Sequence, residues 1–329
     1  MDAVAYALAS QLKVKGRGGW YPRTGTGSIP NTIYYHDQGV GFAINGRGYV
    51  AGGYDGSNTS TSVKTEQYDQ ISNSWSEKAN FPSFVKRAAA FVLNGKAYIS
   101  GGQYDLLSES QSTRVYCYDP VTNTYAQKAN MTLARREHMT WSVNGKGYVY
   151  GGVTLASDGY QQIERYDDVT NTWTKLPNAS YPRYGAASAV LEGKAYIFGG
   201  SISGSGLTAS LLCFDPATET FSTRAYGLWY RHAHVMEAVG GKLYTTYGRD
   251  DDGNHLLTTD IYDPVSNTWD PARGQDVFSS RAYASSFVIG HSFYVCGGGY
   301  NATPYNTAAR FEAAYLSGSE ELLTWLAAN

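Results

Sequence analysis

The chain has 329 residues and a formal net charge of −2, with 42% hydrophobic and only 16% charged residues. A near-neutral chain without a basic stripe excludes nucleic acid as an expected partner, and its apolar runs are too short to predict membrane insertion. Three widely spaced cysteines, Cys117, Cys213 and Cys296, fit no zinc-binding pattern, so we expect small apolar strand residues there. The 37 glycines and 29 tyrosines favour a turn-rich all-β protein.

Residues 1–19 are predicted to form an N-terminal helix and a glycine-rich lead-in. The stretch DAVAYALASQL has the spacing of a short amphipathic helix, and KGRGG follows it. The segment lacks the basic start and long apolar core of a secretory signal, which favours a cytoplasmic or virion-associated location. It resembles the anchoring stretches of phage and prophage tail or fibre proteins. That resemblance implies a virion component with an assembly contact through the helix.

A nine-residue pattern then recurs along the chain. It reads NGKAYISGG at 94–102, NGKGYVYGG at 144–152 and EGKAYIFGG at 192–200. The last glycine recurs at intervals of 49, 50, 48, 48 and 50 residues, at Gly53, Gly102, Gly152, Gly200, Gly248 and Gly298. The fifth copy carries Tyr247 in place of the first glycine of the pair. A period near 50 residues indicates an array of equivalent structural units.

A second pattern follows each glycine pair and completes the unit. It reads YDQISNSW at 68–75, YDPVTNTY at 118–125, YDDVTNTW at 166–173, FDPATETF at 214–221 and YDPVSNTW at 262–269. Asp, Pro and Asn between short apolar runs are typical of a tight turn joining two strands. Each unit is therefore predicted to contain two strands, a loop, a third strand, a turn and a fourth strand.

These features, which span about residues 39–311, resemble the kelch repeat. The resemblance implies a six-bladed β-propeller whose blades are four-stranded antiparallel sheets around a central channel. The glycine pairs are expected to allow close backbone approach at the ends of strands. The repeated Tyr and Trp residues are expected to pack between neighbouring blades.

The sixth unit lacks a fourth strand of its own, because position 318, seven residues after Phe311, is glycine. Two segments could supply that strand: an N-terminal one, near Trp20 or in the following RTGTGSI, or the C-terminal one near Trp325. The C-terminal run SGSEELLTWLAAN also has the features of a short helix. We therefore favour N-terminal closure, with residues 20–329 forming the propeller and its C-terminal tail.

One position at the start of each first strand is the main candidate for ligand binding. The six copies carry His36, Val85, Arg135, Arg183, Arg231 and Arg281, with Lys86, Arg87 and Arg136 beside them. In kelch proteins that bind acidic peptides, arginines at this position face the channel mouth. By that resemblance the four arginines, His36 and Arg87 could hold a carboxylate or an anionic sugar. The favoured alternative is structural, with each arginine bonding loop carbonyls or the carboxylates of its own repeat.

We expect a non-catalytic recognition propeller that binds protein or cell-surface glycan through its loops. A sugar-modifying enzyme similar to the kelch-type sialic-acid epimerases and an intracellular kelch adaptor remain as alternatives. We assign no catalytic residue, no metal site and no cofactor. His232 with His234 lacks a third metal ligand, and the aspartates of 249–255 lack the spacing of a calcium-binding EF-hand loop.

Overall fold

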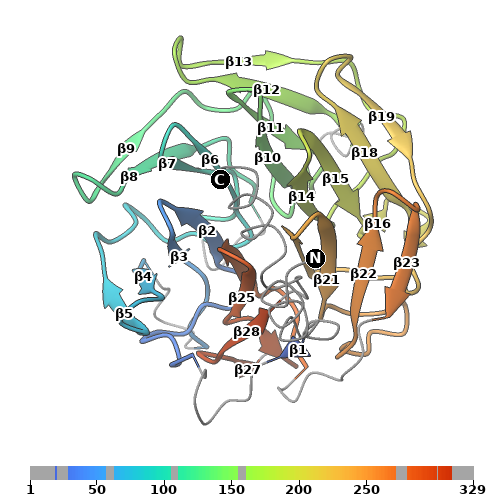
Figure 1. Ribbon diagram of the computed structural model, residues 1–329. Helices are drawn as coiled ribbons and strands as arrows, with labels where there is room; N and C mark the ends of the chain where they lie inside the picture. The colour runs from blue at the N-terminus through green and yellow to red at the C-terminus, as the bar shows by residue number, and fades with distance from the viewer. Residues whose placement is uncertain are drawn as a thin grey trace, which may run out of the picture.

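The computed structural model describes residues 19–20, 29–56, 63–104, 110–154, 161–271, 280–301 and 303–312. These residues form six four-stranded antiparallel sheets, arranged as blades in a ring (Figure 1). The expected all-β, six-bladed kelch-type propeller is therefore confirmed. The helix expected within residues 1–19 and the C-terminal tail beyond residue 312 lie outside the described residues. In the part that is described, no helix has the length and apolar character needed to cross a membrane.

Each blade begins with its innermost strand and adds strands outward. Blade 1 consists of β2 (Val40–Ile44), β3 (Arg47–Ala51), β4 (Thr65–Asp69) and β5 (Ser74–Glu77). Blade 2 consists of β6 (Ala89–Leu93), β7 (Lys96–Ser100), β8 (Val115–Asp119) and β9 (Thr124–Gln127). Blade 3 consists of β10 (Met139–Val143), β11 (Lys146–Tyr150), β12 (Ile163–Asp167) and β13 (Thr172–Lys175). Blade 4 consists of β14 (Ala187–Leu191), β15 (Lys194–Phe198), β18 (Leu211–Asp215) and β19 (Thr220–Thr223). Blade 5 consists of β20 (Val235–Val239), β21 (Lys242–Thr246), β22 (Thr259–Asp263) and β23 (Thr268–Pro271). Blade 6 consists of β24 (Ser285–Ile289), β25 (Ser292–Cys296), β28 (Ala308–Glu312) and β1 (Gly19–Trp20). Two small hairpins, β16 (Ser201–Ile202) with β17 (Gly206–Leu207) and β26 (Gly299–Tyr300) with β27 (Thr303–Pro304), lie in the loops of blades 4 and 6.

The two turns of a blade form where the sequence predicts them. In blade 2, Asn94 and Gly95 both have positive φ, 49° and 72°, as a two-residue hairpin turn of type I′ requires. In the outer turn, Asp119 Oδ1 accepts a hydrogen bond from the Val121 amide at 2.9 Å. The Tyr118 hydroxyl donates to Asn123 Oδ1 at 2.9 Å, so the aromatic and the turn residues of the motif stabilise each other.

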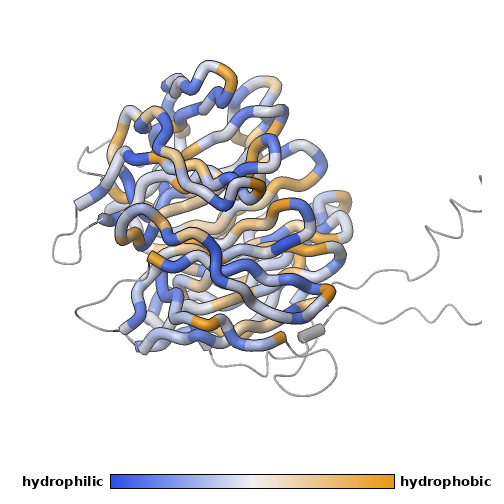
Figure 2. Tube along the Cα trace, turned by 90° about the vertical axis from the view of Figure 1, so that its left-hand side faces the viewer, coloured by the Kyte–Doolittle hydropathy of each residue, from blue (hydrophilic) through white to orange (hydrophobic). Residues whose placement is uncertain are grey.

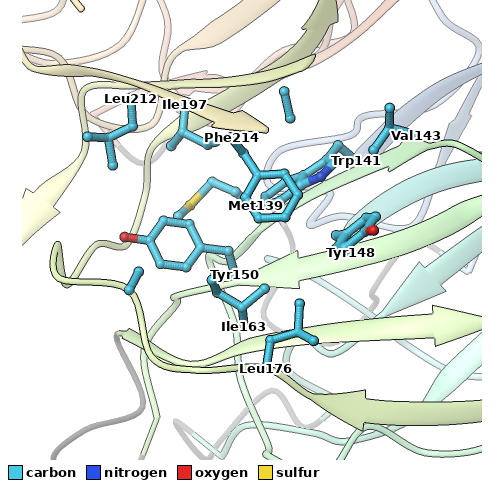
Figure 3. Packing of buried hydrophobic residues seen from close by; sticks show 12 residues of the cluster. Met139, Trp141, Val143, Tyr148, Tyr150, Ile163, Leu176, Ile197, Leu212 and Phe214 are labelled. Carbon is cyan, nitrogen blue, oxygen red and sulfur yellow. The ribbon is translucent and has the colours of Figure 1, made fainter. Parts of the chain in front are cut away.

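The repeated aromatics fill the space between blades, as expected. Phe91 stacks on Tyr98 of its own blade with ring centroids 5.3 Å apart, and it meets Trp173 of the following blade edge-on at 6.3 Å. Between blades 3 and 4, Trp141 lies 5.1 Å from Phe214 within a buried cluster that includes Tyr148, Ile197 and Leu212 (Figure 3). In side view, the hydrophobic residues run along the strands through the body of the ring (Figure 2). Aromatic pairs with this geometry add to the free energy gained by burial alone.

The glycine pair connects each blade to the next one. The second glycine, Gly102, donates its amide hydrogen to the Arg135 carbonyl of the following blade at 2.8 Å. A Cβ atom on the first glycine, Gly101, would lie 2.5 Å from that same carbonyl oxygen, and its φ of 60° also disfavours a side chain. Blade 5 carries Tyr247 at this position with a φ of 61°, so one non-glycine residue does adopt the strained conformation.

The ring is closed by the N-terminal strand. β1 pairs antiparallel with β28, and Trp20 lies opposite Phe311. This is the register that places Trp75 opposite Tyr68 in blade 1, so Trp20 takes the position of the aromatic missing from the sixth unit. The expectation of N-terminal closure near Trp20 is confirmed.

We predict that a chain lacking residues 1–20 melts at a lower temperature than one lacking residues 1–18, which keeps β1. The longer deletion removes the outer strand of blade 6 and exposes the edge of β28. The melting temperature should fall by roughly 2–4 °C for each kcal/mol of stability lost. Calorimetry on both chains gives the comparison, and equal melting temperatures would show that β1 does not stabilise the ring.

Candidate functional site

One side of the ring carries the loops that differ most between blades. Successive strands of a blade are antiparallel, so they run alternately away from one side of the ring and back to it. The first and third strands start on the same side, and the second and fourth strands end there. The loops after the glycine pairs and the connections between blades therefore share this side, which we call the loop face. The Asn-Gly turns and the outer turns lie on the opposite side.

A closed ring of six backbone hydrogen bonds surrounds the channel mouth on the loop face. Each blade contributes one residue whose amide donates to the carbonyl of the equivalent residue in the preceding blade, at 2.8–3.1 Å. All six residues have positive φ, between 53° and 62°. The ring consists of Gln38, Arg87, Glu137, Gly185, Ala233 and Tyr283. The backbone alone makes this ring, so the side chains at these positions are free to differ.

Arg87 is the centre of a polar network at this mouth. Its Nε donates to Gln38 Oε1 at 2.7 Å, and its Nη1 lies 3.2 Å from Glu137 Oε1. The guanidinium also stands 5.8 Å from the centroid of the Tyr283 ring. Three blades on different sides of the channel thus hold one arginine in place. Arg87 lies at this mouth, and the ligand-binding role expected for it from the sequence remains a prediction.

Glu137 joins the same network to a histidine. His232 Nε2 lies 3.6 Å from Glu137 Oε2 across blade 4. Gly185 allows this approach, because a Cβ atom there would be 2.1 Å from the His232 ring nitrogen. Burial opposes ionisation of Glu137, but His232, Arg87 and Arg136 outweigh it and hold the pKa of the Glu137 carboxyl below its ordinary value. Glu137 is therefore an ionised carboxylate at neutral pH.

Basic residues outnumber acidic ones around the mouth. Three positions of each blade are counted: the ring residue, the residue before it and the residue after the glycine pair. Together they include four cations and two anions. These are Lys86, Arg87, Arg136 and Arg249 against Asp37 and Glu137. Arg249 lies 5.8 Å from the Tyr283 ring, on which Arg87 also stands. A partly enclosed site with two excess positive charges favours an anionic group.

The four arginines predicted from the repeat occupy a different layer of the structure. Arg135, Arg183, Arg231 and Arg281 are fully buried, as is His36. Arg135 donates from Nη1 to the Gly151 and Gln162 carbonyls at 2.8 and 3.1 Å, and from Nη2 to Glu164 at 2.6 Å. It therefore joins the second and third strands of its own blade.

The remaining members repeat this arrangement with different partners. Arg231 pairs with Asp260 at 2.7 Å, and His36 pairs with Glu66 at 2.7 Å. Arg183 and Arg281 have a hydroxyl partner in place of the carboxylate, Ser210 at 2.6 Å and Thr307 at 3.0 Å respectively. The bonds of these five side chains lie inside the blades, and this geometry favours the structural alternative for them. The Nε atoms of Arg135, Arg183 and Arg231 are buried without a hydrogen-bond partner. A direct ligand role for these five remains a prediction.

Sequence reasoning found Arg87 but missed its neighbours. Each ring residue follows the buried arginine position of its blade by two residues. The six ring residues are all of different types. Gln38, Glu137 and Tyr283 were missed for this reason. The signal available in the sequence was that the residue type changes from blade to blade at this one position of an otherwise regular repeat.

An exposed aromatic loop lies in the connection between blades 4 and 5, on the loop face. Tyr226, Leu228, Trp229 and Tyr230 have exposed fractions of 69%, 45%, 50% and 51%. In the preceding connections the counterparts of Tyr226 are asparagines, namely Asn80, Asn130 and Asn178. Gly227 packs against Phe198, where a Cβ atom would lie 2.3 Å from the ring. We call residues 226–230 the aromatic loop.

The two segments considered for metal binding have other roles in the structure. Asp250 Oδ1 accepts a hydrogen bond from the Asn254 amide at 2.7 Å and so orders the loop 249–255. His234 is buried and its ring meets Phe198 edge-on, 5.5 Å away. Within the described ranges, no group of three or more His, Cys, Asp or Glu residues is arranged to hold a metal ion.

Comparison with known proteins gives two family matches. The family model of the Attractin/LZTR1 beta-propeller matches residues 147–316, more than half of the chain, and the Kelch motif matches residues 86–132. The solved structure of YjhT is similar, with a TM-score of 0.73, 18% sequence identity, and coverage of 86% of this chain and 96% of that one. At this identity the likeness shows the fold alone. A search of curated proteins found no match.

Breaking one buried ion pair should destabilise the propeller strongly. Replacing Arg231 in an R231M variant leaves the Asp260 carboxylate buried without its cation, which typically costs about 3–5 kcal/mol. The double variant R231M/D260L should recover most of this loss, because blade 2 already has the uncharged pair Val85 and Tyr116 at these positions. Urea unfolding measures all three chains. A single variant within about 1 kcal/mol of the wild type would contradict this assignment.

Proposed function

The chain belongs to the Attractin/LZTR1 beta-propeller family, and from this premise we propose that it is a non-catalytic recognition propeller whose loop face binds an acidic glycan. The observation that carries the proposal is the polar network at the channel mouth. Arg87 is fixed there by Gln38 and Glu137 and is only partly buried, with 21% of its side chain exposed. A guanidinium held in one orientation can form paired hydrogen bonds with a carboxylate or sulfate group.

The net charge of the mouth supports an anionic ligand over a neutral one. Two more cations than anions surround the opening, and Arg249 approaches Tyr283 from the side of blade 5. Low-dielectric walls strengthen the field of such charges relative to the same charges in bulk water. The site therefore suits a ligand with one or two negative groups.

The aromatic loop supports a glycan as the carrier of that anionic group. Tyrosine and tryptophan offer flat apolar faces together with a polar edge, and the C–H faces of pyranose rings can stack on them. Tyr230 precedes His232 by two residues, which places its Cα within roughly 7 Å of the His232 Cα. Tyr184 meets the His232 ring edge-on at 5.8 Å and continues the aromatic surface toward blade 4. A sugar chain could place its acidic group at Arg87 and its rings on the aromatic loop.

One observation favours the sugar-modifying enzyme as a second candidate. Glu137 and His232 form a carboxylate–imidazole pair beside Arg87, and such a pair can accept and donate a proton at a bound sugar. The two functions differ in outcome, because an enzyme would alter the glycan that it binds.

Presentation on a virion would require an assembly contact by the N-terminal segment. Residues 1–18 lie outside the described part of the chain, so this role is a prediction of the sequence alone. It is compatible with a loop face directed at a cell surface.

We expect the purified protein to bind acidic glycans on a glycan array and to leave each bound glycan chemically unchanged. R87A should weaken binding at least about tenfold, the equivalent of one charge-assisted interaction. W229A should weaken it several-fold. Binding should also weaken as salt concentration rises.

Two features make the comparison of R87A with the wild type specific for the Arg87 side chain. Alanine already occupies the equivalent ring position in blade 5, at Ala233, so R87A keeps a residue that the backbone ring accepts. V121A, at an 88% exposed residue on the opposite side, is the matched control and should bind normally. Unchanged affinity of R87A, or hits confined to neutral glycans or proteins, would contradict the proposal. Any chemically altered glycan would favour the enzyme.

A further inference from the structure

Blade 5 carries a glutamate where most blades carry a core aromatic. The residue at the middle of the innermost strand is Phe42, Phe91, Trp141 or Phe287 in four of the blades. Each of these rings stacks on the tyrosine opposite it, with interplanar angles of 8°, 4°, 9° and 15°. In blade 5, Glu237 occupies this position and lies opposite Tyr244. A carboxylate here gives up an aromatic contact and is partly desolvated, which favours a functional reason for it.

Glu237 lies on the wall of the central channel. It lines a cavity of about 390 Å³ together with residues of all six innermost strands. Its Oε1 accepts a hydrogen bond from the Ser286 hydroxyl of blade 6 at 2.7 Å. Among the described residues it forms no ion pair, and it is the one acidic side chain that lines this cavity. Burial raises the pKa of the Glu237 carboxyl to about 7.

The hydroxyls on the channel wall show how blade 5 departs from its neighbours. Thr140 donates to the Ala90 carbonyl of the preceding blade at 2.7 Å, and Ser188 donates to the Thr140 carbonyl at 2.9 Å. Ser286 is the equivalent residue of blade 6, but it donates to the Glu237 side chain instead of to the Met236 backbone. The Glu237 carboxylate and the Ser286 oxygen therefore lie together on the wall of the cavity that Met236 also lines.

The other titratable groups near Glu237 are neutral. Tyr244, opposite it on β21, has its pKa raised to about 12 by burial. His138 and His234 line the same cavity, and burial together with nearby arginines lowers their pKa values well below the ordinary value. Ser286 on β24 carries no charge. An ionised Glu237 would thus have no protein cation facing it from these strands.

We propose that Glu237 and Ser286 bind a monovalent cation inside the central channel. Loss of hydration on the channel wall makes an ionised carboxylate unfavourable unless its charge is neutralised. A proton does this in acid, and a small cation can do it when the carboxylate is ionised. Oxygen-only donors suit hard cations, and a single carboxylate matches a single positive charge. The site is separate from the loop face, so it goes beyond the recognition function proposed above.

The test compares thermal unfolding in sodium or potassium chloride with unfolding in tetramethylammonium chloride at the same ionic strength. The bulky organic cation keeps ionic strength constant and is too large for a site between two strands. At pH 8.5 the wild type should melt roughly 2–5 °C higher with sodium or potassium. At pH 5.5, where Glu237 is protonated, the difference should disappear.

Three variants make the result specific to this residue. E237Q should lose the cation dependence at pH 8.5. E237F, which introduces the aromatic that four other blades carry, should lose it too. E219Q is the matched control, because Glu219 is an ion-paired carboxylate away from the channel, and it should keep the wild-type response. Equal cation dependence in E237Q and the wild type would overturn the proposal.

A diffraction experiment on the unmodified protein tests the same site without a variant. Crystals soaked in rubidium chloride at pH 8.5 should show an anomalous peak beside Glu237 and Ser286. A channel without such a peak would overturn the proposal, whatever the unfolding of the variants shows.

Discussion

The closed ring of six backbone hydrogen bonds at the channel mouth is the constraint on which the rest of the structure depends. Each bond joins neighbouring blades through residues with positive φ, and only one of these six, Gly185, is a glycine. Five non-glycine residues in that conformation are tolerated because the surrounding blades impose it. The amides of the second glycines, such as Gly102, add a further interblade bond nearby. Together these contacts hold the mouth at a fixed diameter.

This constraint separates the structural residues from the variable ones. The buried arginines and His36 satisfy carbonyl groups where the strands of a blade diverge, and Arg135 and Arg231 do so with the help of a carboxylate. Two residues further along, the ring position is defined by its backbone, so its side chain can be Gln, Arg, Glu or Tyr without loss of the ring. A rigid scaffold that presents variable side chains at one opening is well suited to recognition.

The sequence predicted the architecture well because the architecture is repeated. A period near 50 residues, the paired glycines and the Tyr-Asp turn indicated six blades. The aromatic missing after Phe311 left the last strand to one of the two termini, and the helical features of the C-terminal run favoured the N-terminal one, which pairs there through Trp20. The site was predicted only in part, because a regular repeat draws attention to the residues that recur. Arginines such as Arg183 and Arg231 recur because four blades make the same internal bonds, whereas Glu137 and Tyr283 occur once each at the ring position. Glu237 was not recognised because its significance depends on the aromatic stacking that it replaces.

We propose that recognition takes place at the mouth, beside Arg87, and not on the opposite face or in the buried arginine layer. The most direct measurement is a crystal structure of the protein with an acidic glycan bound. We predict that the acidic group lies within hydrogen-bonding distance of the Arg87 guanidinium and that sugar rings contact Trp229 or Tyr230. A glycan bound at the outer turns, or one that displaces Glu164 or Asp260 from the buried arginines, would contradict the account.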